Sequence, residues 1–195
     1  MNIVFASGNR GKLREAGEIL MGCDIVPISA FPKWKAPEET GSTFLQNAVI
    51  KAEAAAAAAE GQIVLSDDSG LVVPALNGAP GIFSARFSSE GTDSANRRKL
   101  LDALSGISDR SAYFLCSAVM IFPDRTVLAA EGRCCGRIIE SVRGENGFGY
   151  DPLFVPDGYG KTLAELSEEE KNVISHRGKA FRKLISRAAD LHWIS

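Results

Sequence analysis

Two adjacent carboxylates follow a short apolar run near position 65, with one serine, Ser66, in between. Asp67 and Asp68 come after the apolar residues 63–65 and are followed by Ser69 and Gly70. A strand that ends in this way predicts a turn that presents acidic oxygens to solvent or to a cation. Adjacent anions repel each other, and proteins tolerate that cost where a metal ion or a reacting group offsets it. A plain surface turn is the alternative interpretation, because Asp, Ser and Gly are the ordinary turn residues.

Length and composition predict a single globular domain that covers residues 1–195. Hydrophobic residues make up 45% of the 195-residue chain and charged residues 24%, as in soluble proteins that bury a core. The formal net charge of -2 argues against a general duplex-binding surface, so we expect no nucleic acid partner. That charge is still compatible with a local basic pocket for a small polyanion.

The cysteines and the N-terminal segment predict a cytoplasmic protein. Cys23, Cys116, Cys134 and Cys135 show no C-x-x-C spacing, and three of them lie in apolar stretches, as expected for small buried side chains in a reducing compartment. The chain enters a strand-like segment at once, so we expect no signal peptide. No apolar run approaches the roughly 20 residues that span a bilayer, and we expect no membrane partner.

Hydrophobic periodicity predicts one compact α/β unit, with two lobes around a cleft. We expect strands at 2–6, 25–28, 62–66, 112–122 and 126–138, and an ordered loop at 71–87. Helices are expected at 12–21, from 42 or 43 to about 60, at 93–104 with a cap at Thr92 or Asp93, and from 167 to 189 with a division at Gly178. The pairs Thr43 with Gln46 and Ser167 with Glu170 predict capping boxes.

The first strand is followed by a glycine-containing turn that opens a helix. This turn consists of Ser7, Gly8, Asn9, Arg10, Gly11 and Lys12. Free backbone N–H groups and the helix dipole favour an anion there, and Lys12 adds a positive charge. The turn is not a Walker A loop, because Ala6 and Leu13 stand where that motif needs Gly and Ser or Thr. A plain turn with an exposed lysine is the alternative.

A second set of charged and polar residues lies around the start of the next helix, with some members before the helix and others on its first turns. Thr43, Asn47 and Lys51 recur every four residues and therefore share a helix face, just after Glu38 and Glu39. In the functional interpretation Lys51 meets a phosphate, and Glu38 or Glu39 meets a cation near Asp68. The alternative is a solvated helix face.

Two polar clusters near the C-terminal third have features of a ligand site. Residues 147–152 form a loop in which Phe148 stands between two glycines and is followed by Tyr150 and Asp151, so that a ring face is open for stacking on a planar base. For Tyr150 we expect instead a ring that anchors the loop. Lys171 and the segment Ser175-His176-Arg177-Gly178 supply donors suited to carbonyl acceptors on a ligand, although a lone histidine is more often structural.

Taken together in chain order, these motifs resemble the inosine triphosphate pyrophosphatase family. The matching residues cover nearly the whole chain: Ser7-Gly8-Asn9 with Lys12, Glu39-Thr40-Gly41, Phe44, Asn47, Lys51, Asp67-Asp68-Ser69-Gly70-Leu71, Gly78-Ala79-Pro80-Gly81, Ser84-Ala85-Arg86, Gly147-Phe148-Gly149-Tyr150-Asp151-Pro152, Lys161-Thr162, Glu165-Leu166, Glu170-Lys171 and Ser175-His176-Arg177-Gly178. Gln46 and Ser66 depart from the usual Glu and Ala. Each motif is weak alone, but the ordered set is specific.

The resemblance implies a fold, a reaction and a cofactor. It implies a mixed α/β fold with an elongated central sheet flanked by helices, two lobes around a nucleotide-binding cleft, and a homodimer. It also implies Mg²⁺-dependent hydrolysis of ITP, dITP and XTP, which are non-standard purine nucleotides, to the monophosphate and pyrophosphate. Small-molecule nucleotides are then the substrates.

The resemblance also implies roles for single residues. Asp68 is similar to the base that activates water against the α-phosphorus, and Glu39 and Asp68 resemble the metal ligands. The implied substrate contacts are Ser7, Gly8, Asn9, Arg10, Gly11, Lys12 and Lys51 for the triphosphate, and Ser69, Phe148, Gly149, Tyr150, Asp151, Lys171, His176 and Arg177 around the purine.

Hydrogen-bond polarity explains the selectivity that the resemblance implies. Hypoxanthine and xanthine present a 6-oxo acceptor to donors such as His176 or Arg177, whereas adenine presents a donor and leaves groups unpaired. No residue explains how GTP is rejected. Two other hypotheses stay open: a Maf-like pyrophosphatase for other modified nucleotides, and a nucleotide sensor that does not catalyse a reaction.

Overall fold

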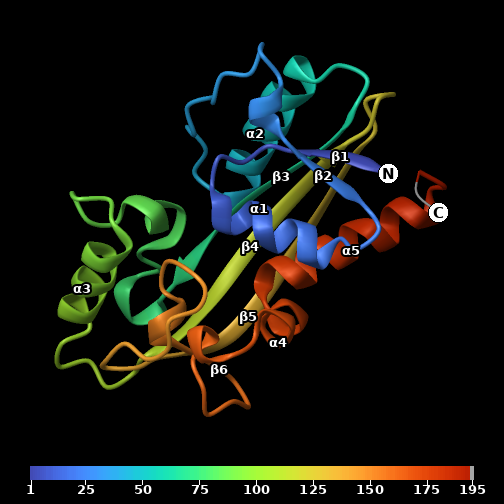
Figure 1. Ribbon diagram of the computed structural model, residues 1–195. Coiled ribbons are helices and arrows are strands. Elements are labelled where there is room, and N and C mark those ends of the chain that lie inside the picture. The colour runs from blue at the N-terminus through green and yellow to red at the C-terminus, as the bar shows by residue number, and fades with distance from the viewer. Residues whose placement is uncertain (194–195) are drawn as a thin grey trace. The chain divides into compact units, whose positions relative to one another are not determined.

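The molecule is a mixed α/β protein, seen in a computed structural model that describes residues 1–193 (Figure 1). The strands are β1 (Asn2–Phe5), β2 (Asp24–Pro27), β3 (Ile63–Val72), β4 (Ser111–Ile121), β5 (Val127–Ile138) and β6 (Phe154–Pro156). The helices are α1 (Arg10–Ile19), α2 (Phe44–Ala58), α3 (Asp93–Ala103), α4 (Glu168–Ile174) and α5 (His176–Asp190). None of these described helices is long and apolar enough to cross a membrane.

The strands form one six-stranded sheet in the order β2-β1-β3-β4-β5-β6. Strand β1 pairs in parallel with both β2 and β3, whereas β5 and β6 pair antiparallel. The expected fold class, a mixed sheet flanked by helices, is therefore confirmed.

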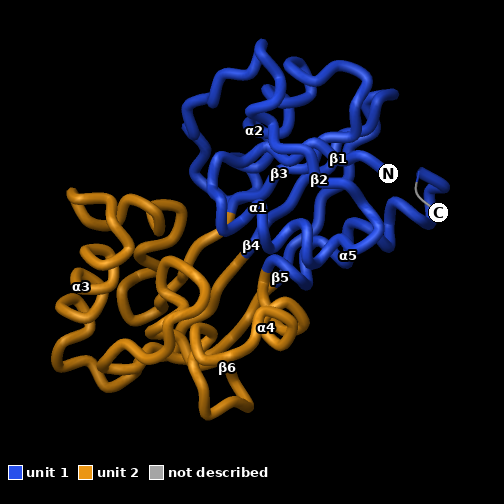
Figure 2. The backbone as a smooth tube through the Cα atoms, in the orientation of Figure 1, with its two compact units in different colours: residues 1–68, 116–132, 177–195 blue, residues 69–115, 133–176 orange. Residues whose placement is uncertain are grey.

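The chain divides into two compact units, which Figure 2 colours separately. Unit 1 contains residues 1–68, 116–132 and the described part of 177–195, and unit 2 contains residues 69–115 and 133–176. The chain passes from one unit to the other inside β3, β4 and β5, and once more between His176 and Arg177.

In unit 1, β1 and β3 bury side chains on both faces of the sheet, as parallel strands usually do. Ile3, Phe5 and Leu65 pack with apolar residues of α1 and α5. Val4 and Val64, which alternate with them, pack instead with the alanine-rich face of α2. This alternation assigns α1 and α5 to one face of the strands and α2 to the other.

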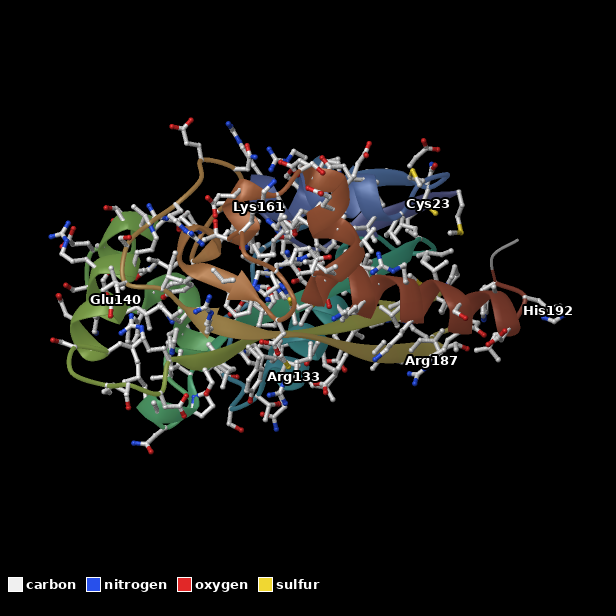
Figure 3. The ribbon with its side chains drawn as sticks, turned by 90° about the horizontal axis from the view of Figure 1, so that it is seen from below. Cys23, Arg133, Glu140, Lys161, Arg187 and His192 are labelled. Atoms are coloured by element: carbon white, nitrogen blue, oxygen red, sulfur yellow. The ribbon has the colours of Figure 1, made fainter. Side chains whose placement is uncertain are left out.

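Helix α5 is also fastened to β5 by long basic side chains. Lys183 Nζ donates to the Glu131 carbonyl at 2.8 Å, and the Arg187 guanidinium donates to the Ala129 carbonyl. Arg187 leaves α5 on the side that faces β5 (Figure 3). The aliphatic stems of such residues cover apolar surface while their charged ends bind backbone oxygens.

Unit 2 has its own core. Its buried members come from β3, α3, β4, β5 and the segment around β6, and they include Leu71, Leu100, Phe114, Ile138 and Phe154. The rings of Phe114 and Phe154 meet edge to face with centroids 4.9 Å apart.

The local signals in the sequence predict most elements, and both capping boxes are confirmed. The Thr43 hydroxyl accepts from the Gln46 N–H at the start of α2, and Ser167 does the same for Glu170 at α4. Thr92, not Asp93, caps α3. The last helical segment divides at Ser175 rather than at Gly178, and the short strand β6 was not foreseen.

The expected turn at Asp67 and Asp68 is wrong. Strand β3 continues through both residues to Val72. The local preference of these residues for a turn is overridden by their tertiary contacts. Both carboxylates are buried and pair with basic side chains, one on each face of the strand, so neither needs solvent to stabilise its charge.

A substitution at Gly136 tests how closely the backbones of β5 and β6 approach each other. A Cβ at Gly136 would lie 2.3 Å from the Val155 carbonyl oxygen, whereas a Cβ at Gly160 would meet no atom within 4 Å. We expect Gly136→Ala to lower the free energy of unfolding by about 1–3 kcal/mol, because the strands must separate. Gly160→Ala is the matched control and should change it by less than about 0.5 kcal/mol. Equal urea midpoints for the two variants would contradict this packing.

Candidate functional site

Asp67 and Asp68 point to opposite faces of β3. Successive side chains of a strand alternate between the faces of its sheet. Asp67 therefore joins the side chains of α1 and α5, and Asp68 joins those of α2. The two neighbours in sequence thus belong to two different charged clusters of unit 1.

Asp67 lies at the centre of the first cluster. Its Oδ2 accepts from Lys12 Nζ at 3.0 Å, from Arg177 Nη2 at 3.1 Å and from Arg177 Nε at 3.2 Å. Arg177 Nη1 also pairs with Glu15 Oε2. The side chains of Asp67, Arg177 and Glu15 are at most 1% exposed and are shielded from solvent, whereas the Lys12 side chain is 15% exposed.

The opposite charges in this cluster stabilise one another's ionised forms. Burial acts to raise the pKa of Asp67, but the charges of Lys12 and Arg177 lower that pKa well below its usual range. Burial acts to lower the pKa of Arg177, and Asp67 with Glu15 raises it. Burial and the neighbouring Asp67 raise the pKa of the Cys116 thiol, which therefore stays protonated.

Asp68 belongs to the second cluster, with two residues of α2. Its Oδ1 accepts from Lys51 Nζ at 3.0 Å and its Oδ2 from Asn47 Nδ2 at 3.2 Å. Glu39 Oε1 lies 2.9 Å from the same Lys51 ammonium. Asn47 Oδ1 in turn accepts from the Gly41 N–H at 2.9 Å, which fixes the amide and the loop that carries Glu39.

This second cluster holds two carboxylates around one ammonium. Burial raises the pKa of Asp68, and Glu39 raises it further against the opposing effect of Lys51. Burial acts to lower the pKa of Lys51, but Asp68, Asp67 and Glu39 raise it. The excess of negative charge means that a further cation would be stabilised here.

Glu39 and Asp68 fit a divalent cation on the chemistry of their donors. Both carboxylates already lie within 3.0 Å of one cationic centre, the Lys51 ammonium. No group of three or more Asp, Glu, His or Cys suited to a metal occurs within residues 1–193. Mg²⁺ commonly takes one or two carboxylates and completes its shell with phosphate oxygens and water. The pair therefore suits a Mg²⁺ that arrives with a phosphate ligand.

The turn before α1 carries the remaining candidates of unit 1. Asn9 caps the helix, since its Oδ1 accepts from the Lys12 N–H at 3.1 Å, and Ser7 Oγ accepts from the Asn9 N–H at 3.2 Å. Gly8 and Arg10 are exposed, and Gly11 is half-buried. The free N–H groups of the first turn give this end of α1 the polarity that favours anions.

In unit 2, the Phe148 loop is held by Asp151. Asp151 Oδ2 accepts from the Phe148 N–H at 3.0 Å and from Lys171 Nζ at 2.6 Å. A Cβ at Gly147 would lie 2.2 Å from this oxygen, so only glycine fits there. Tyr150 is buried and its hydroxyl donates to the Ser84 carbonyl at 2.9 Å, as expected for a ring that anchors the loop.

Lys171 and His176 are both buried in unit 2. The Lys171 ammonium lies 5.1 Å from the centroid of the Phe148 ring, within the range of a cation–π contact. The His176 ring stacks on Phe114 with centroids 4.8 Å apart and an angle of 12° between the planes. Phe148 itself is half-buried.

The candidate residues thus fall into groups. Unit 1 brings together Glu39, Lys51 and Asp68, and separately Lys12 and Arg177 with Asp67. Unit 2 brings together Phe148, Asp151 and Lys171. Ser69 lies half-buried in the part of β3 that belongs to unit 2.

Sequence reasoning also missed charged residues. Glu15, the buried partner of Arg177, stands three residues after Lys12 and thus near it on α1, a spacing that offered a signal. Asp93 and Arg97 hydrogen-bond the backbone of Gly149, and their spacing of four on α3 was the only hint.

Carboxylates, lysines and a helix N-terminus on a mixed α/β fold are features typical of phosphate-binding proteins. The sequence profile of the Ham1 family matches residues 3–187. A protein named dITP/XTP pyrophosphatase from Desulforamulus reducens is 48% identical over 188 residues, covering 94% of this chain and 93% of the relative. One of the same name from Deinococcus deserti is 46% identical over 182 residues, covering 93% and 86%.

Solved structures agree with these relatives. The Ham1 protein of Staphylococcus aureus superposes with a TM-score of 0.86 at 44% identity, covering 97% of this chain and 99% of that one. A nucleoside-triphosphatase / dITP/XTP pyrophosphatase from Mycobacterium abscessus gives a TM-score of 0.75 at 43% identity, covering 94% and 98%. The chain belongs to the Ham1 family, and the resemblance in its motifs is confirmed.

Arg177 tests the energetics of the first cluster. We expect Arg177→Met to lower the free energy of unfolding by about 3–5 kcal/mol, because Asp67 and Glu15 stay buried without a guanidinium. Arg14→Met is the control: Arg14 is half exposed and pairs with Glu18 at 3.8 Å, so its loss should cost less than about 1 kcal/mol. Denaturant titration that gave similar losses for both variants would disprove the assigned role of Arg177.

Proposed function

We propose that this chain hydrolyses the non-standard purine nucleoside triphosphates ITP, dITP and XTP to the monophosphate and pyrophosphate. The observation that carries the proposal is the convergence of Glu39 and Asp68 on Lys51, in a chain whose near-full-length relatives are named dITP/XTP pyrophosphatases. The fold and this cluster support the reaction class, and the names of the relatives support the substrates.

In this proposal Asp68 accepts the proton of the water that attacks the α-phosphorus. Its raised pKa suits a base better than the pKa of an exposed aspartate would, and Asn47 and Lys51 fix the orientation of its carboxylate. Asp67 is a poor candidate for the same role, because its side chain is buried and the charges of Lys12 and Arg177 lower its pKa well below its usual range.

The triphosphate is bound by positive charge and backbone donors. Lys12 and Lys51 each have three N–H donors, so they can keep their carboxylate partners and still donate to phosphate oxygens. The N-terminal end of α1 adds backbone donors and a favourable helix dipole. The residues assigned to this end are Ser7, Gly8, Asn9, Arg10 and Gly11. Phosphoryl transfer needs mainly such positioning and charge neutralisation.

Glu39 and Asp68 would hold Mg²⁺, which supplies further neutralisation of the triphosphate and a lower pKa for the attacking water. Because residues 1–193 contain no group of three or more metal-binding side chains and the proposal assigns two carboxylates to the cation, binding of the cation and of the nucleotide should be coupled.

Residues of unit 2 receive the purine in this proposal. Phe148 stacks on the base, and Lys171 pairs with Asp151 while its ammonium lies over the same ring. His176, with its ring fixed on Phe114, supplies a donor for the 6-oxo group. The proposal assigns a second donor of this kind to Arg177, which belongs to unit 1. Ser69, Gly149 and Tyr150 complete the proposed set.

We further propose that the chain acts as one pyrophosphatase domain within a cytoplasmic homodimer. The match to relatives over nearly the full length supports the single functional domain. The dimer and the compartment rest on the family resemblance and on the cysteine pattern.

Product analysis tests the proposed reaction. Equal concentrations of ITP, XTP, GTP, ATP and dTTP are incubated with Mg²⁺, and pyrophosphate is separated from orthophosphate. We expect pyrophosphate with IMP or XMP, and ATP and GTP nearly untouched. Orthophosphate release or a pyrimidine preference would favour a different pyrophosphatase, and the absence of turnover would favour a sensor.

Asp68→Asn tests the identity of the base. We expect kcat for ITP to fall by about 10²–10⁴-fold, because the amide cannot accept the proton. Nucleotide affinity should stay within about threefold when it is measured without Mg²⁺, since Asp68 is also a proposed ligand of the cation. Asp157→Asn, a change at an exposed aspartate of unit 2, is the control and should leave kcat unchanged. Unchanged turnover in Asp68→Asn would remove Asp68 from this role.

A further inference from the structure

Two side chains of helix α3 hydrogen-bond the backbone of Gly149, the residue that follows Phe148. Asp93 Oδ2 accepts from the Gly149 N–H at 2.7 Å, and Arg97 Nη1 donates to the Gly149 carbonyl at 2.7 Å. Both backbone polar groups of Gly149 are thus bound by one helix. All of these residues belong to unit 2.

These contacts fix the backbone on both sides of Phe148. The Phe148 N–H belongs to the peptide plane before the residue and donates to Asp151 at 3.0 Å. The Gly149 N–H belongs to the plane after it and donates to Asp93. Because each plane is oriented by a carboxylate, φ and ψ of Phe148 are both restrained, and so is the direction in which its ring leaves the chain.

The local sequence of α3 explains why Asp93 and Arg97 can bind the backbone of Gly149. Thr92 caps the helix through the Ala95 N–H, so Asp93 at the first helical position is free to bind outside its own helix. Arg97 follows four residues later and therefore lies on the same side of α3. The Gly149 backbone has a φ of 61°, a left-handed conformation that glycine adopts without strain.

We infer that Asp93 and Arg97 are positioning residues that hold the Phe148 ring in the orientation required to stack on the purine base. This inference rests on the proposed function, since it takes Phe148 as the base contact. A ring held in place before binding loses less freedom when the ligand arrives. Asp93 and Arg97 thereby act on affinity for the base and not on the chemistry at the phosphate.

Single variants with matched controls test whether the hydrogen bonds from Asp93 and Arg97 to Gly149 position Phe148. We expect Asp93→Ala and Arg97→Ala each to raise KM for ITP about tenfold with kcat nearly unchanged. Asp93→Asn should retain most of the affinity, because its amide oxygen still accepts from the Gly149 N–H. Asp102→Ala and Arg98→Ala, at exposed positions of the same helix, should match the wild type. Asp93→Ala kinetics equal to these controls would overturn the inference.

A double-mutant cycle separates positioning from a general structural role. In a Phe148→Ala background, Asp93→Ala and Arg97→Ala should cause no further rise in KM, because the ring that they orient is gone. The inhibition constant of inorganic tripolyphosphate should be the same in all variants. An unchanged tenfold effect in the Phe148→Ala background, or weaker tripolyphosphate binding, would overturn the inference.

Calorimetric titration with IMP distinguishes this inference from the proposed function. IMP binding that is weakened in Asp93→Ala would support the positioning role even if the wild type showed no turnover of ITP. Turnover of ITP with IMP affinity equal in Asp93→Ala and the wild type would overturn the positioning role and leave the reaction intact. A wild type that does not bind IMP would overturn the role of Phe148 and this inference with it.

Discussion

The alternation of side chains along β3 is the constraint on which the rest of unit 1 depends. Because Asp67 and Asp68 are neighbours in a strand, they enter opposite faces of the sheet and meet different helices. Asp67 binds α1 and α5 through Lys12 and Arg177, and Asp68 binds α2 through Asn47 and Lys51. One dipeptide therefore connects the strand to the helices on both of its faces.

The two clusters differ in their charge balance, and this difference divides their roles. Around Asp67, buried cations lower its pKa, so the folded state favours the ionised form. Around Asp68, burial and Glu39 raise the pKa against the opposing effect of Lys51, so the folded state disfavours the ionised form. Functional sites often carry such a cost, because the groups that react are not those that maximise stability.

Much of this architecture could be predicted from the sequence, but not the conformation at its centre. Periodicity and the capping box at Thr43 located α2, and a spacing of four predicted that Asn47 and Lys51 share a face. The same reasoning predicted a turn at Asp67, because local propensity contains no information on partners that are distant in sequence. Arg177, which is 110 residues away, makes burial of Asp67 possible. The link of Asp93 and Arg97 to Gly149 is likewise set by tertiary contacts.

The central claim is that Asp67 serves the fold and Asp68 serves the chemistry, and paired denaturation of Asp67→Asn and Asp68→Asn tests it most directly. The measurement is the free energy of unfolding at neutral pH with EDTA present. The account predicts that Asp67→Asn lowers it by about 3 kcal/mol or more, since Arg177 and Lys12 lose a buried charge partner. It predicts that Asp68→Asn leaves it unchanged within about 0.5 kcal/mol or raises it, because the neutral amide removes a disfavoured charge. Equal losses in the two variants, or a larger loss in Asp68→Asn, would contradict the account.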